Sequence, residues 1–327
     1  MTRRSHLFSF ACIAACVALI SAAALAQGDS YPSKPIKVIV PFPAGGAADL
    51  TIRTLGPKLT ELLGQPIVVD NKPGANGIIG ADAVAKSAPD GYTILFAPRE
   101  VFGVNPSLYA SLPYDPVKSF AHVAIVTEAP YVLVVNPSLG VKTVAELLAV
   151  AKTRQLSFGS FGMGSMGHLN LEAFAQATGI KLQHIPYKGA PAAVQAVVGG
   201  EVALAITTPP AALAFIRDGK LIALAAGSEK RLALLPEVPT LAEAGVSSDT
   251  LIPAYFAMAA PAGTSSAIIA RLNAELRRAL AVTDIAERFA KTGLIPAGSS
   301  PEAMTAVINQ DIARFAALVK AIGIKPE

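Results

Sequence analysis

Two stretches of this chain share one order of features: a short strand-like segment, a glycine-rich loop and a helical pattern. The first covers residues 36–63 and contains the loop 41–46, and the second covers residues 156–178 and contains the loop 160–165. Each is followed by another short strand-like segment. Strand, loop, helix and next strand in this order are typical of an open sheet covered by helices. The sequence therefore predicts an α/β fold.

The same order extends over most of the chain and gives two α/β units of similar size. We expect strands at residues 36–40, 66–70, 92–97, 131–135, 156–159, 182–185, 202–207, 221–226 and 255–259. We expect helices at residues 48–63, 78–86, 143–151, 168–178, 190–198, 265–281 and 301–321. Thr143 and Glu146 have the spacing of a capping box, in which each side chain satisfies a backbone N–H at the start of a helix.

The chain is expected to pass between the two units twice, near residues 126–129 and near residues 226–228. Domain 1 would then consist of residues 31–126 and 228–327, with domain 2, residues 127–227, inserted into it. The roughly 300 residues that follow the N-terminal leader are enough for two ordinary domains.

The leader has the three parts of a secretory signal peptide, residues 1–26. Arg3 and Arg4 are followed by an uncharged apolar run at 7–25, and small residues at Ala24 and Ala26 favour cleavage before Gln27. A membrane anchor is the alternative, because about 18 apolar residues can span a bilayer. We expect cleavage near Ala26 and a mature protein that works outside the cytoplasm.

Two further interpretations of the leader stay open. Residues 2–7 partly resemble a twin-arginine signal, although His6 replaces the expected bulky apolar residue, so Sec and twin-arginine export are both possible. Residues 13–16 resemble a lipoprotein cleavage site, which would lipidate Cys16. The only cysteines, Cys12 and Cys16, lie in the leader, so the mature chain has no disulfide, thiol nucleophile or thiolate metal site.

Composition excludes disorder and argues against nucleic-acid binding. The chain is 52% hydrophobic and 15% charged, which is typical of a well-buried globular protein. Removing Arg3 and Arg4 with the leader lowers the net charge from +4 to +2, and the remaining basic residues are scattered.

Both glycine loops offer a site for an anion. Glycines let several backbone N–H groups converge, and a helix N-terminus adds unpaired donors and partial positive charge. Two such loops could hold the two ends of a small acid; the alternative for either loop is a plain turn. Neither loop matches a nucleotide-binding motif, because the loop at 159–164 lacks the P-loop lysine and the loop at 43–46 lacks the dinucleotide spacing. We expect no cofactor.

Two polar residues begin the helices that follow these loops. Asp49 either accepts N–H bonds and complements the helix dipole, or orders waters and meets a ligand amine. His168 either caps its loop or donates to a carboxylate. His122 and His184 lie in strand-like apolar surroundings and are interpreted as structural.

Neither catalysis nor metal binding has a clear signal. Ser160 and Ser165 lie on a glycine loop, but the G-x-S-x-G spacing of a nucleophile elbow is absent around both. The three histidines of the mature chain are widely spaced, without an H-x-x-x-H pair. A binding protein is therefore favoured over an enzyme, and no metal site is expected.

The motifs together resemble one family. The chain is similar to the Bug-type receptors, the extracytoplasmic solute-binding proteins of the tripartite tricarboxylate transporter family. The resemblance covers nearly the whole mature chain and rests on motifs in the expected order: PFPAGGAAD at 41–49, NKPGANG at 71–77, PDGYT at 89–93, LPYDP at 112–116, GSFGMGS at 159–165 with His168, PYKG at 186–189, LPEVPT at 235–240 and APAGT at 260–264.

The resemblance implies a two-lobed periplasmic-binding-protein fold of the type II kind, with a hinge between two α/β domains. It also implies a periplasmic monomer that holds a carboxylate in an interdomain cleft, partly through ordered water, and delivers it to a membrane permease. Carried onto this sequence, the expected ligand-binding residues are Phe42, Pro43, Ala44, Gly45, Gly46, Asp49, Ser160, Phe161, Gly162, Gly164, Ser165, His168 and Thr207.

The sequence departs from the family's pattern at three places. Ala196 and the pair at 207–208, both threonines, stand where relatives often carry Asp, which argues against an amino-acid ligand. Arg99 and Glu100 are more charged than expected after the strand at 92–97. Either Arg99 faces the cleft and pairs with a carboxylate, or the two residues form a solvated pair.

Three hypotheses about function follow. The leading one is a receptor that captures a small organic acid, a dicarboxylate or an aromatic acid, for uptake. The alternatives are a ligand sensor that docks onto a membrane signalling partner and a secreted hydrolase using Ser160 or Ser165. The sequence does not name the ligand, because backbone loops accept many carboxylates.

Overall fold

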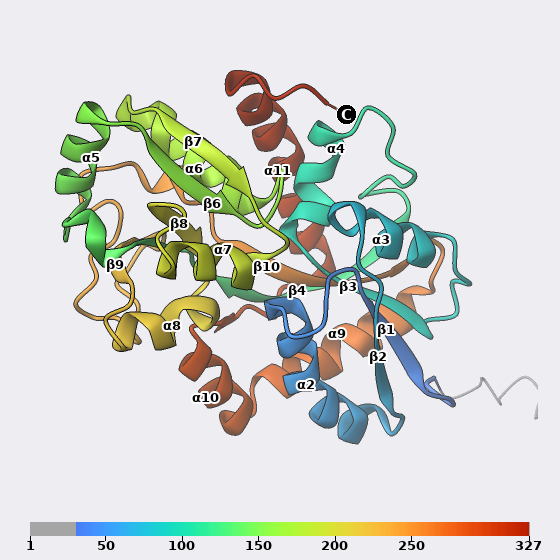
Figure 1. Cartoon of the computed structure of the whole chain (residues 1–327). Coiled ribbons are helices and arrows are strands. Elements are labelled where there is room, and N and C mark those ends of the chain that lie inside the picture. The colour runs from blue at the N-terminus through green and yellow to red at the C-terminus, as the bar shows by residue number, and fades with distance from the viewer. Residues whose placement is uncertain (1–30, 327) are drawn as a thin grey trace, which may run out of the picture.

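The structure is a computed structural model and describes residues 31–326. Its elements belong to two mixed sheets, each with its own helices, and Figure 1 shows the two sheets side by side. We call the first sheet and its helices lobe one, and the second sheet and its helices lobe two. This two-lobed α/β arrangement confirms the predicted fold class.

Lobe one is built on six strands in the order β11-β4-β10-β3-β1-β2. Its strands are β1 (Ile36–Val40), β2 (Ile67–Asn71), β3 (Thr93–Pro98), β4 (Phe120–Ala129), β10 (Ala254–Pro261) and β11 (Ile295–Pro296). Its helices are α2 (Ala47–Leu63), α3 (Ile78–Ala85), α4 (Asn105–Leu108), α9 (Ser266–Leu280), α10 (Thr283–Thr292) and α11 (Pro301–Ala321), with the π-helical turn η2 (Glu100–Val104) directly after β3. Strand β1 is parallel to β2 and β3, whereas β10 is antiparallel to β3 and β4.

Lobe two is built on five strands in the order β7-β6-β8-β5-β9. Its strands are β5 (Val132–Val135), β6 (Leu156–Ser160), β7 (Leu182–Pro186), β8 (Leu204–Thr207) and β9 (Ile222–Ala226). Its helices are α5 (Val144–Thr153), α6 (Met166–Thr178), α7 (Ala190–Val198) and α8 (Pro209–Arg217). Strand β6 is parallel to β7 and β8, so the chain repeats in lobe two the strand, loop and helix order of lobe one.

The chain passes between the sheets at two places. Only residues 130–131 separate β4 from β5, while the return from β9 to β10 takes residues 227–253. Part of this return segment packs on lobe two, because Leu232, Leu235 and Val238 share a buried cluster with residues of β5, β8 and α7. The domain limits expected from the sequence stay a prediction.

The capping box predicted from the sequence is present at the start of α5. The Thr143 hydroxyl accepts the N–H of Glu146 at 3.1 Å, and the Glu146 carboxylate reaches back to the N–H of Lys142 at 2.6 Å. The reciprocal bond thus lies one residue earlier than the motif predicts. Strand β4 and helices α8 and α10 were not expected.

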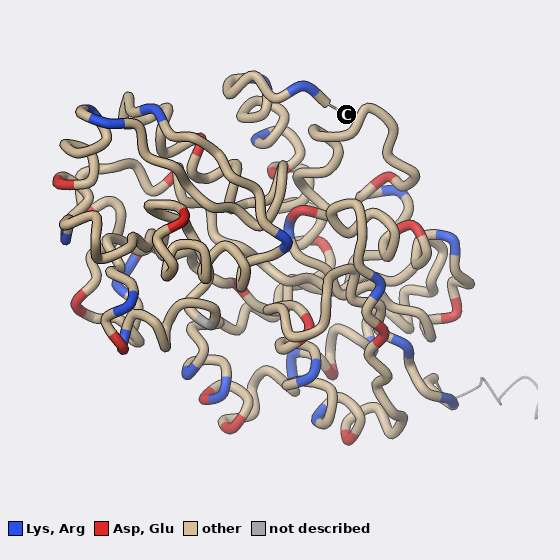
Figure 2. Tube along the Cα trace, in the orientation of Figure 1, with Lys and Arg blue, Asp and Glu red and all other residues tan. Residues whose placement is uncertain are grey.

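The surface carries mixed charge. Figure 2 shows Lys and Arg interspersed with Asp and Glu over both lobes, in line with the scattered basic residues of the sequence. Within residues 31–326, no helix combines the length and apolar character needed to cross a bilayer. The expected signal peptide lies outside the described residues.

Candidate functional site

The glycine loop of lobe one is organised by an acid on the helix that follows it. Gly45 has a φ of +81°, which favours glycine, and Gly46 precedes α2 without a side-chain cap. The buried carboxylate of Asp49 accepts the N–H of Gly45 at 2.9 Å, Arg53 Nε at 2.9 Å and Asn71 Nδ2 at 3.1 Å. Asp49 therefore orders its own loop, the first of the two roles considered for it.

Hydrogen bonding keeps Asp49 ionised. Burial alone would raise the pKa of this carboxyl, but the bonds from Arg53, Gly45 and Asn71 outweigh burial and hold the pKa below its usual value. Asn71 also donates to the carbonyl of Phe42 at 3.1 Å. All the partners of this loop come from lobe one.

The glycine loop of lobe two is organised by hydroxyl groups. Ser165 caps α6: its Oγ accepts the N–H of His168 at 3.3 Å and donates to the carbonyl of Gly162 at 2.8 Å. Ser160 Oγ lies 3.0 Å from the same carbonyl and 3.2 Å from the N–H of Gly162. The loop is thus held by hydrogen bonds between residues close in sequence, and the side chains that make these bonds are uncharged.

Two histidines lie beneath this loop. His168 Nδ1 accepts the N–H of Gly164 at 3.2 Å, so neutral His168 carries its proton on Nε2, which lies 3.7 Å from Glu172. The His168 ring stacks on His184, with ring centres 3.8 Å apart. Burial, assisted for His168 by the charge of its neighbour, lowers the pKa of both imidazoles to about 4. His168 therefore caps its loop as a neutral ring.

His184 was expected to be structural, and its structural role is to support this loop. Its Nε2 lies 2.6 Å from Ser160 Oγ, a contact that sequence reasoning did not anticipate. In the parallel pairing of β6 and β7, Phe158 lies opposite His184. This register places the His184 ring below the loop, and it is the feature from which the contact could have been predicted. His122 bonds Thr305 and the carbonyl of Pro116, in agreement with its structural interpretation.

A histidine within reach of Ser160 keeps the hydrolase hypothesis testable. However, Ser160 is fully buried, and its hydroxyl is placed to donate to Gly162, in which case His184 is the donor to Ser160. Among residues 31–326, no carboxylate hydrogen-bonds His184 to orient it as a base. The same part of the chain contains no cluster of His, Cys, Asp and Glu that could hold a metal.

The two lobes meet beside the N-terminus of α6. The Glu100 carboxylate, from η2 of lobe one, accepts the N–H of Met166 at 3.3 Å. Tyr131 stacks on Phe161 with ring centres 6.1 Å apart. A Cβ on Gly164 would lie 2.2 Å from Leu108 of α4, so lobe one closely abuts the loop here. The loop of lobe two is therefore one of the places where the lobes touch, besides the approach of Gly293 after α10 to Pro209 of α8.

The interpretation of Arg99 and Glu100 as a solvated pair is wrong. Their exposed fractions are 8% and 6%. Arg99 does pair with a carboxylate, but with Asp311 of α11 from its own lobe, and its guanidinium lies 4.4 Å from the ring centre of Tyr255. Several buried polar atoms around this group have no hydrogen-bond partner among the described residues, including Arg99 Nε, Glu100 Oε2 and Tyr255 Oη.

The remaining expected residues are distributed as follows. Thr207 ends β8, pairs with Val132 next to the short crossing, and is fully buried with Oγ1 unpartnered within the described chain. Ala196 lies in an apolar cluster of lobe two. The structure joins Phe42, Gly45 and Asp49 in one bonded loop, and Ser160, Gly162, Gly164, Ser165 and His168 in the other. Within residues 31–326, no hydrogen bond joins the two loops.

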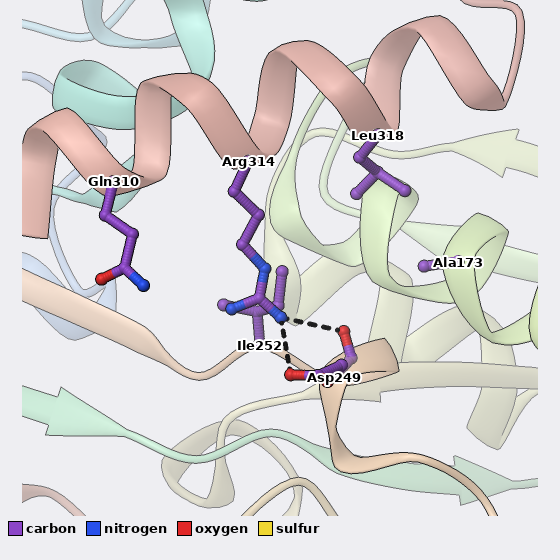
Figure 3. A pocket seen from close by; sticks show the side chains of 6 residues that line it. All are labelled: Ala173, Asp249, Ile252, Gln310, Arg314 and Leu318. Atoms are coloured by element: carbon purple, nitrogen blue, oxygen red, sulfur yellow. Dashed lines mark hydrogen bonds and ion pairs between the residues drawn. The ribbon is translucent and has the colours of Figure 1, made fainter.

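A separate cavity of about 600 Å³ lies between α6, α11 and the segment that precedes β10. Its lining residues are Ala173, Asp249, Ile252, Gln310, Arg314 and Leu318. Figure 3 shows Arg314 reaching from α11 to Asp249, with an ion pair of 3.1 Å. None of the expected ligand-binding residues lines this cavity.

Known proteins resemble the chain over nearly all of its length. The family model described as "Tripartite tricarboxylate transporter family receptor", TctC, matches residues 51–324. Protein BugT of Bordetella pertussis is 41% identical over 312 residues, which cover 94% of this chain and 95% of BugT.

Solved structures agree with this assignment. "R. palustris Rpa4515 with adipate" matches with a TM-score of 0.85 and 33% identity, over 91% of this chain and 100% of its own. The periplasmic binding protein BugD matches with a TM-score of 0.83 and 32% identity, over the same shares. "MatC (Rpa3494) from Rhodopseudomonas palustris with bound malate" matches with a TM-score of 0.79 and 29% identity, over 88% and 100%. The chain therefore belongs to the TctC family, the Bug-type receptors of the tripartite tricarboxylate transporters.

Proposed function

We propose that this protein captures a small carboxylate between its two lobes outside the cytoplasm and delivers it to a membrane permease of the tripartite tricarboxylate type. The observation that carries the proposal is the pair of glycine loops, one in each lobe, that each lead directly into the N-terminus of a long helix, α2 or α6. Such a terminus attracts anions through unpaired N–H groups and the helix dipole. The thirteen residues expected from the sequence, Phe42 to Thr207, are the proposed site.

The ligand class is supported by relatives. Adipate and malate are the ligands named for two of the matching structures, and both are small carboxylates. An amino-acid ligand is disfavoured, because Thr207 and Ala196 offer no charge to an ammonium group. We therefore propose a dicarboxylate or an aromatic acid.

Closure around the ligand would use the short crossing at residues 130–131 as one hinge strand. A ligand that touches both loops binds the closed state better than the open one, and that difference in affinity is what shifts the population.

Calorimetry with dicarboxylates, aromatic acids and nicotinate tests the site. We expect a ligand in the micromolar range or below. Gly46→Val, which covers backbone N–H groups at α2, and Ser165→Ala, which removes the cap of α6, should each weaken it at least tenfold. Ser265→Ala removes an equivalent cap from α9 of lobe one and should leave affinity unchanged. Intact binding in Gly46→Val and Ser165→Ala would show that the site is assigned wrongly.

The transport role needs its own experiment. Pull-down from membranes with and without ligand should recover a permease of the tripartite type. Recovery of a signalling protein instead would favour the sensor hypothesis. N-terminal sequencing of the exported protein tests cleavage near Ala26 against lipidation at Cys16.

We also propose that the protein is not an enzyme. The buried Ser160 and the neutral His184 support this proposal. Covalent labelling of Ser160 or Ser165 by a serine-reactive probe would contradict it.

A further inference from the structure

Glu100 carries a buried carboxyl group at the contact between the lobes. It belongs to η2 of lobe one, and its Oε1 accepts the N–H of Met166, the first residue of α6 in lobe two, at 3.3 Å. Its Oε2 has no partner among the described residues, and the side chain is only 6% exposed. Tyr131, which lies in the short crossing between the lobes, is close enough to interact with its charge. The burial of Glu100 therefore involves groups from outside its own lobe.

The surroundings of this carboxyl favour its neutral form. Arg99 is the adjacent cation, but its guanidinium pairs with Asp311 and lies against the ring of Tyr255. A carboxylate loses far more hydration on burial than a neutral carboxyl does, and one N–H bond offsets little of that loss. Burial accordingly raises the pKa of Glu100, and the bond from Met166 and the charge of Arg99 only reduce the rise.

The neighbouring elements add no charge that would reverse this preference. Strand β3, the turn η1 (Ala75–Gly77) and α4 contain no charged residue. On α11, Asp311 pairs with Arg99 and Arg314 pairs with Asp249. His168 of α6 is neutral at neutral pH, with its pKa lowered to about 4. Burial raises the pKa of the nearby phenols, which are therefore neutral as well: Tyr114, Tyr131 and Tyr255.

Parting of the lobes would change the state of this group. It would break the bond between Glu100 and Met166 and give water access to the carboxyl. The pKa of Glu100 would then return toward its ordinary value of 4.5, well below neutral pH. At any pH between the ordinary and the raised value, the closed receptor holds one proton more than the open receptor.

We propose that Glu100 couples ligand capture to proton uptake: its carboxylate is ionised while the lobes are apart and takes a proton from the solvent when they close around the ligand. The inference rests on the proposed function, because it requires closure around a carboxylate, and it adds a regulation of that same site by pH. The dissociation constant should rise with pH, by up to about tenfold per pH unit for one proton, until pH passes the raised pKa of Glu100.

The test is calorimetry with adipate, malate and benzoate as probes, between pH 5.5 and 7.5. Each titration is repeated in buffers that differ in their enthalpy of ionisation, because the dependence of the heat on that enthalpy gives the number of protons taken up. Glu100→Gln keeps an acceptor for Met166 but does not titrate. At some pH in this range the wild type should take up close to one proton more than Glu100→Gln, and its affinity should depend more steeply on pH. Subtracting the variant removes any proton bound by the probe itself.

Glu146→Gln is the matched control. Glu146 also accepts a backbone N–H at a helix N-terminus, but on the exposed side of α5 and within lobe two, so its loss should leave proton uptake unchanged. If Glu100→Gln does not fold, wild-type uptake with benzoate above pH 6.5 decides, because that probe and His168 do not titrate there. Binding with the same proton uptake in wild type and Glu100→Gln at every pH would overturn the inference and leave the proposed function standing. If none of the panel acids binds the wild type, the proposed function itself fails, and the inference with it.

Discussion

The two glycine loops have the same place in their lobes, but they are stabilised in different ways. The loop before α2 depends on one ionised side chain, Asp49, whose partners Gly45, Arg53 and Asn71 all belong to lobe one. The loop before α6 depends on neutral groups within its lobe, and the buried carboxyl of Glu100, whose pKa burial raises, reaches it from the opposite lobe.

This difference suggests that only the loop of lobe two depends on how the two lobes are placed relative to each other. The loop of lobe one is complete by itself, so its shape should not depend on where lobe two lies. The loop of lobe two is contacted by Leu108 and Glu100 of lobe one, so its surroundings change when the lobes part. We therefore expect lobe one to present a preformed half of the site, while the half in lobe two responds to closure.

The largest effect is expected from Gly164→Ala. Gly164 has a φ of +68°, and a Cβ there would lie 2.2 Å from Leu108 Cδ1. A left-handed alanine costs about 1 kcal/mol and overpacking about 1–3 kcal/mol more, so the free energy of unfolding should fall by about 2–4 kcal/mol. Urea unfolding measures it.

Gly179→Ala is the control, because Gly179 has a φ of +69° with open space around its Cα. It should cost only about 1 kcal/mol. If both variants lose the same stability, lobe one does not press on the loop of lobe two in solution.

Asp49→Ala tests the self-contained loop. It removes the acceptor of three hydrogen bonds, two of them from uncharged donors, and should lower the free energy of unfolding by about 2 kcal/mol. Asp284→Ala is its counterpart, since Asp284 and Arg288 have the same spacing as Asp49 and Arg53 but are both exposed. That change should cost less than about 0.5 kcal/mol. Equal losses in a thermal-unfolding series would contradict the role assigned to Asp49.

Acid should affect the two loops in different pH ranges. The folded pKa of His168 and His184, about 4, lies below the unfolded value of 6.5, so the unfolded chain binds more protons between these values. Stability should therefore fall as pH drops from about 6.5 to about 4. The pKa of Asp49 is lowered, so its contribution is lost only as pH falls below 3.8.

His184→Gln isolates this effect from His122, whose pKa is also lowered by burial. Glutamine keeps a hydrogen-bonding group near Ser160 and does not titrate, so the slope between pH 6.5 and 4 should decrease. An unchanged slope in unfolding curves measured across this range would mean that the histidine pair does not support the loop.

The smallest effect is expected from Gly45→Ala. Gly45 has a φ of +81°, but no atom lies within 4 Å of an added Cβ. Only the left-handed backbone opposes alanine, so the loss should be about 1 kcal/mol by urea unfolding. If Gly45→Ala lowers the free energy of unfolding as much as Gly164→Ala does, the loop of lobe one is not more loosely surrounded than the loop of lobe two.

The repeating strand, loop and helix order was enough to predict both sheets and both glycine loops, because it depends on local periodicity. Strand β4 was missed: it is almost entirely buried and carries no alternation of polar and apolar residues. The contact of Glu100 with Met166 was also missed, since it joins two lobes across 66 positions of the sequence. His184 could have been found only through the register of β6 and β7.

The strand order of lobe one has a consequence for how the chain folds. Strand β10 lies between β3 and β4, yet it follows all of lobe two in the sequence. The six-stranded sheet of lobe one therefore cannot be completed before residues 254–261 are available for pairing. In the same way, Arg99 cannot form its ion pair before Asp311 of the last helix is available. Lobe two has all its strands in one continuous stretch and can assemble as soon as it appears. We expect lobe two to fold first. The N-terminal strands of lobe one should complete their sheet only after the C-terminal third of the chain is available.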